Sequence, residues 1–86
     1  MSAEFEEQDH ARAAKKFIDL ANSLVAEGIS MNTVSAALMT ASGTYSTFTH
    51  VGDSGVLTPE EVNQFANAYR SQLAYIQDIK RAGSTE

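Results

Sequence analysis

The fold is decided by one stretch of sequence, Ser30-Met-Asn-Thr-Val-Ser-Ala-Ala-Leu-Met-Thr-Ala-Ser-Gly-Thr-Tyr-Ser-Thr-Phe-Thr49. It lies within residues 28–52, which contain no Lys, Arg, Asp or Glu, although 20% of the chain is charged. Its large apolar residues recur at alternating spacings of three and four, which places them on one face of an α-helix. They are Met31, Val34, Leu38, Ala41, Tyr45 and Phe48. The periodicity predicts a helix over residues 31–49, although Gly43 destabilises it by about 1 kcal/mol relative to alanine.

An amphipathic helix is predicted on each side of this stretch. The first, over residues 3–27, has one apolar stripe and ends before Gly28, a residue that commonly follows a last helical turn. The other, over residues 59–82, begins after Thr58 as its N-cap and ends before Gly83.

Three further signals support the start of the helix over residues 59–82. Pro59 occupies the first helical position, Glu61 completes a capping box with Thr58, and Leu57 with Val62 forms a hydrophobic staple. The sequence therefore predicts an all-α, antiparallel three-helix bundle with helices over residues 3–27, 31–49 and 59–82 that dimerises. We expect a single domain over residues 1–86, with frayed ends near 1–3 and 83–86.

Composition excludes several classes of protein. The net charge of −5 argues against a sequence-independent grip on nucleic acid. The absence of cysteine excludes a disulfide scaffold and a thiolate zinc site, and it fits a cytoplasmic protein. No segment reaches the ~20 apolar residues that span a bilayer, and the first residues do not resemble a secretory signal. We expect a cytoplasmic protein that binds neither nucleic acid nor membranes.

The helix over residues 31–49 has a second, unusual face opposite its large apolar residues. An ordinary surface helix carries Glu and Lys there, but this one carries small or uncharged residues that are inexpensive to desolvate. We call Ser35, Ala36, Met39, Gly43 and Thr47 the small-residue face. Two interpretations remain open: the other two helices cover this face, or it is an interface with a second copy of the chain. Tyr75, at the edge of the third helix's stripe, is predicted to join the interface of a homodimer.

The candidate sites for chemistry are few. His50, Gly52 and Ser54 fall where an EF-hand needs oxygen ligands, so calcium binding is not expected. His10 stands in no metal-ligand pattern, and a His50–Asp53 pair has no accompanying nucleophile motif. No catalytic residue, cofactor or metal ligand is predicted.

Two runs of residues resemble a known family. They are Phe17-Ile-Asp-Leu-Ala-Asn22 and Val34-Ser-Ala-Ala-Leu-Met39, followed by Ala41, Tyr45 and Phe48. They are similar to a family of small bacterial all-helical proteins known as a domain of unknown function, over residues 14–81. The chain departs from that family at Thr40-Ala-Ser-Gly-Thr44, where the family has an aromatic and Arg-rich second helix. The resemblance implies a bacterial, cytosolic protein without an established activity.

Two functions are compatible with the sequence. The first is a non-enzymatic, self-associating helical interaction module whose partner surface includes the small-residue face. The alternative is a small-molecule-binding or minor catalytic protein with an inter-helix pocket near Tyr45, His50 and Asp53.

Overall fold

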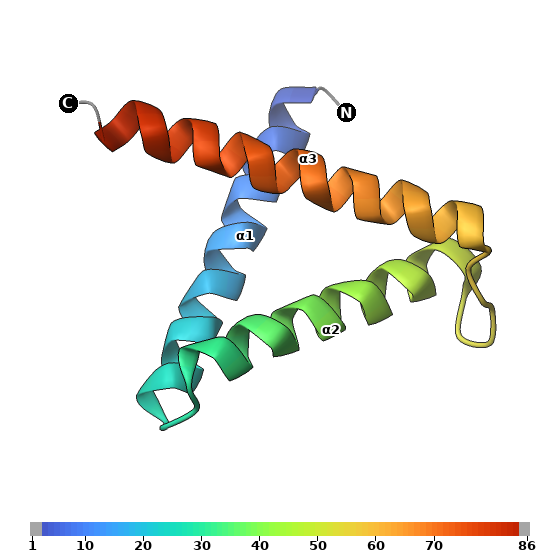
Figure 1. Ribbon diagram of the computed structural model, residues 1–86, viewed down its shortest axis with the longest axis horizontal. Helices are drawn as coiled ribbons and strands as arrows, with labels where there is room; N and C mark the ends of the chain where they lie inside the picture. Colours follow the sequence, from blue (N-terminus) through green and yellow to red (C-terminus); the bar gives the residue numbers. More distant parts are fainter. Residues whose placement is uncertain (1–2, 85–86) are drawn as a thin grey trace. The chain divides into compact units, whose positions relative to one another are not determined.

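The computed structural model describes residues 3–84 and contains three α-helices (Figure 1). These are α1 (Ala3–Ala26), α2 (Met31–Val51) and α3 (Pro59–Ser84). No strand occurs between residues 3 and 84. The predicted all-α fold with three helices is confirmed, and α1 contacts α2. The fraying predicted for residues 1, 2, 85 and 86 lies outside the described residues, and dimerisation stays a prediction.

The chain divides into two compact units. The first, Met1–Ser46, contains α1 and most of α2. The second, Thr47–Glu86, contains the last turn of α2, the loop after it and α3. The prediction of a single domain over residues 1–86 remains a prediction.

Gly28 ends α1 as the sequence predicts. Its φ is +107°, a left-handed conformation that glycine adopts without a Cβ penalty. The Gly28 N–H donates to the carbonyl of Val25 at 2.9 Å, and the Ile29 N–H donates to the carbonyl of Leu24 at 3.2 Å. These two bonds are the pair that defines a Schellman motif. They turn the chain sharply so that α2 can begin only a few residues later (Figure 1).

Ser30 caps the start of α2. Its Oγ accepts a hydrogen bond from the Thr33 N–H at 3.2 Å and donates to the Thr33 Oγ1 at 2.9 Å. Its carbonyl accepts the first helical bond, from the Val34 N–H at 3.0 Å. Val34 has only 5% of its surface exposed and is the one buried apolar residue between residues 6 and 83. The core of the first unit therefore lies where α2 leaves the turn, on the apolar face predicted from the sequence.

Three helix ends differ from the predicted boundaries, and the first of these is the end of α1 at Ala26, one residue early. α2 extends to Val51, two residues beyond the predicted end, because the residue that stops it is Gly52. Gly52 has a φ of +81°, and its N–H donates to the carbonyl of Phe48 at 2.8 Å. α3 continues through Gly83 to Ser84, so Gly83 does not end that helix. Glycine ends a helix only where the backbone turns left-handed, and Gly83 does not.

Each unit leaves much of its own apolar stripes exposed. On α1, Phe17 and Ile18 are 61% and 56% exposed. On α3, every large apolar residue of the stripe is at least 37% exposed. These exposed fractions refer to the whole chain. Within its own unit alone, each of these side chains is at least as exposed. Each unit thus presents apolar surface that needs a covering partner.

Candidate functional site

The start of α3 holds a connected set of polar contacts. The Thr58 Oγ1 accepts from the Glu61 N–H at 3.1 Å, and the Glu61 Oε1 accepts from the Thr58 N–H at 2.8 Å. These reciprocal bonds confirm the predicted capping box. They satisfy two backbone donors that the first turn of a helix otherwise leaves without partners.

The second carboxylate oxygen of Glu61 binds His50. The Glu61 Oε2 lies 2.6 Å from the His50 Nε2, across the loop that joins α2 to α3. The imidazole also meets the ring of Phe65 edge-on, with ring centroids 5.7 Å apart and planes at 84°. Both residues that hold His50 belong to α3, one helical turn apart. His50 and Glu61 therefore fasten the last turn of α2 to the first turn of α3.

The contacts of Glu61 also decide its protonation. The hydrogen bond from the Thr58 backbone, followed by that from the His50 side chain, lowers the pKa of Glu61 below its usual value of 4.5. A lowered pKa makes this carboxylate a weaker base, and both of its oxygens already take part in hydrogen bonds. The arrangement joins the last turn of α2 to the first turn of α3.

From the sequence, Glu61 was predicted only as part of the capping box, and Asp53 was the candidate partner of His50. The structure pairs His50 with Glu61 instead. The signal was present in the sequence, because His50 lies near the end of one predicted helix and Glu61 near the start of the next, on either side of one short loop. Of the residues predicted near the alternative pocket, Tyr45 belongs to the first unit, whereas His50 and Asp53 belong to the second.

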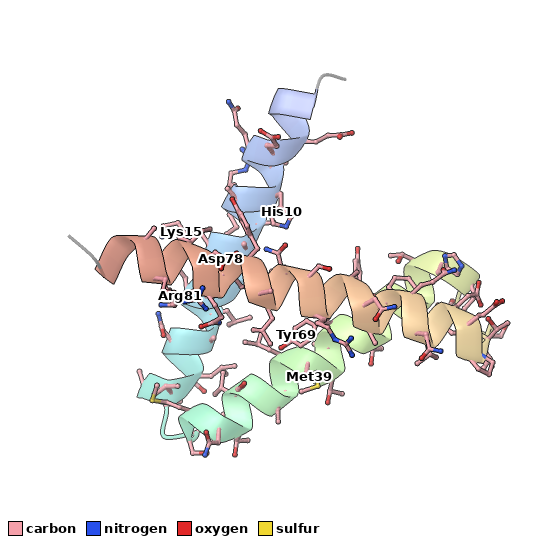
Figure 2. All side chains as sticks on the ribbon, turned by 45° about the horizontal axis from the view of Figure 1, so that its top comes forward. His10, Lys15, Met39, Tyr69, Asp78 and Arg81 are labelled. Carbon is pink, nitrogen blue, oxygen red and sulfur yellow. The ribbon has the colours of Figure 1, made fainter. Side chains whose placement is uncertain are left out.

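The small-residue face follows α2 as predicted, since α2 is one continuous helix from Met31 to Val51. Ser35, Ala36, Met39 and Gly43 are exposed, and Thr47 is half-buried. Met39 is 61% exposed and projects from α2 (Figure 2). Apart from its chain neighbours and the nearby backbone of α2 itself, no atom lies within 4 Å of a Cβ built on Gly43. Tyr75, the predicted interface residue of α3, is 59% exposed.

Three further ion pairs each lie within a single helix. Arg12 pairs with Asp9 and Lys15 with Asp19 on α1. On α3, Arg81 pairs with Asp78, and both are labelled in Figure 2. Each N–O distance is 2.9 Å, and the side chains are at least 60% exposed. Exposed pairs of this kind contribute only about 0–1 kcal/mol each. Across the described residues, no three His, Asp or Glu side chains gather where they could hold a metal ion.

Comparison with known proteins gives a family but no activity. A family described as "Protein of unknown function (DUF3144)" matches residues 11–78. The chain belongs to this family. The resemblance inferred from the sequence, to a family of unknown function over residues 14–81, is thereby confirmed. No curated protein and no solved structure matches the chain.

The matched residues of the DUF3144 family include both helix junctions described above, the Gly28 turn and the His50–Glu61 corner. They end within α3, before Lys80 and Arg81. Among the described helices, none has a window apolar enough and long enough to cross a membrane.

Proposed function

We propose that this member of the DUF3144 family is a non-enzymatic helical interaction module that self-associates as a homodimer. The observation that carries the proposal is the chemistry of α2. This helix contains no Lys, Arg, Asp or Glu, and Ser35, Ala36, Met39 and Gly43 on the face opposite its large apolar residues are exposed. A helix that faces solvent normally carries charged or polar residues on the face opposite its apolar stripe.

Burial of such a face is favourable for two reasons. Removing Ala36 and Met39 from water has no charge-desolvation penalty, and Gly43 allows another backbone to approach closely. The chain is also small. Its 86 residues bury a limited fraction of their surface, so association is a natural source of additional stability.

The other properties of the module follow from the same reasoning. The proposed dimer is cytoplasmic and bacterial, in keeping with the cysteine-free composition and with the resemblance on which the family was first inferred. No catalytic step is assigned to His50 and Glu61, because they are engaged with each other.

Charge insertion on the small-residue face tests the proposal. Met39→Glu places a carboxylate in the proposed interface and should convert the dimer into a monomer, as measured by size-exclusion chromatography with light scattering. Gln8→Glu is the matched control, since it adds the same charge at an exposed position of α1. Circular dichroism should show equal helix content in both variants. A Met39→Glu protein that stays dimeric would remove the small-residue face from the interface.

A further inference from the structure

α3 carries a long apolar stripe that its own unit leaves uncovered. The six large residues of the stripe are between 37% and 57% exposed, and they recur at spacings close to seven residues in two interleaved sets. They are Val62, Phe65, Tyr69, Leu73, Ile76 and Ile79. The His50 ring, the neighbour from α2, lies against Phe65 near one end of the stripe. From Tyr69 onward the stripe continues along α3 away from His50.

The charge of α3 favours a second α3 as the covering element. The whole chain has a net charge of −5, but α3 has none: its three acidic residues, Glu60, Glu61 and Asp78, are balanced by Arg70, Lys80 and Arg81. Two copies of α3 can therefore meet without net repulsion, unlike two copies of the acidic α1. The charges are also separated along the helix: Glu60 and Glu61 lie in the first turn, and Lys80 lies at the other end beside the Asp78–Arg81 ion pair.

That separation selects an antiparallel arrangement. In a parallel pair, Glu60 would face the partner's Glu60 and Lys80 the partner's Lys80, so like charges would meet at both ends. In an antiparallel pair, each acidic end lies beside a basic end, and the two helix dipoles oppose each other.

One antiparallel register aligns the two ends of the stripe with each other. With the two-fold axis between residues 70 and 71, Val62 lies opposite the partner's Ile79, and Phe65 opposite the partner's Ile76. The same register places the large Leu73 and Tyr75 near the partner's Ala66 and Ala68, so bulky side chains meet small ones on both flanks.

From the exposed stripe, the balanced charge and this register, we propose that α3 pairs antiparallel with the α3 of a second copy, with the two-fold axis between residues 70 and 71. The proposal rests on the self-association proposed above and adds α3 to the surface of α2 as a contact between the copies. Tyr75, predicted at the interface from its place beside the stripe, lies within the pairing surface.

Distances between spin labels test the register. The chain contains no cysteine, so one nitroxide can be attached to each of three full-length variants, Asn63→Cys, Ser71→Cys and Gln77→Cys. All three positions lie on α3 outside the stripe and are exposed. At a rise of about 1.5 Å per residue, the two labels of a dimer would be displaced along the axis by about 22 Å at Asn63, 1.5 Å at Ser71 and 20 Å at Gln77.

Double electron–electron resonance should therefore give its shortest distance at Ser71 and clearly longer distances at Asn63 and Gln77. Equal distances at all three positions would indicate a parallel pair and overturn the proposal. A dimer by sedimentation without a minimum at Ser71 would overturn the α3 pairing alone and leave self-association standing. Labelled chains that sediment as monomers, like the unlabelled protein, would overturn both.

Discussion

Replacing Gly43 with alanine separates the stability of α2 from its association. Gly43 lies in the interior of α2, and a Cβ built there meets no atom within 4 Å. The new methyl group therefore fits without strain, and the variant gains the difference in helix propensity between alanine and glycine, about 0.8–1 kcal/mol. For a domain of this size, that gain raises the melting temperature by about 4–8 °C.

The gain should be measured by thermal denaturation, followed by far-ultraviolet circular dichroism, at a concentration low enough for the monomer to dominate. An unchanged or lower melting temperature there would refute the reasoning, because it would mean that another part of the monomer packs against Gly43. At high concentration the same methyl group should hold two α2 helices apart and weaken dimerisation. Gly83→Ala is the matched control: Gly83 is also helical with open space at its Cβ, but it lies outside the small-residue face.

Three further substitutions test the helix junctions through urea unfolding. Gly28→Ala forces a side chain into a left-handed conformation and should lower the free energy of unfolding by about 1–2 kcal/mol; an unchanged value would contradict the role of the Schellman turn. Thr58→Ala removes the oxygen that accepts the Glu61 N–H and should destabilise by about 1 kcal/mol, whereas Thr58→Ser should retain most of the stability. Because the pKa of Glu61 is lowered on folding, its contribution is present above about pH 4.5 and is lost as the pH falls through the folded-state pKa. Glu61→Gln should flatten this acid dependence, and identical pH profiles for the two proteins would show that the carboxylate is not responsible.

The helix starts and the first helix end were predictable because they depend on neighbouring residues. The Gly28 turn, the Ser30 cap and the Thr58–Glu61 box each involve side chains and backbone groups no more than a few positions apart, and the structure confirms all three. The end of α2 was placed too early, because Gly52, and not the first turn-forming residue, takes the left-handed conformation.

The features that depend on the path of the chain were harder to predict. His50 and Glu61 are eleven residues apart, so their contact depends on how the loop returns and not on a helical spacing. The covering of the apolar stripes also depends on the path of the chain. Their periodicity predicts that they pack against something, but it does not identify the element that covers them. Of these residues, Val34 alone is buried, because it lies next to the turn that brings α1 and α2 together.

Sedimentation equilibrium of the full chain is the most direct test of self-association. If the chain forms the proposed homodimer, we expect a mass about twice the 9.3 kDa of one chain at tens of micromolar protein. The dimer fraction should fall on dilution. A mass of a single chain across that concentration range would contradict it.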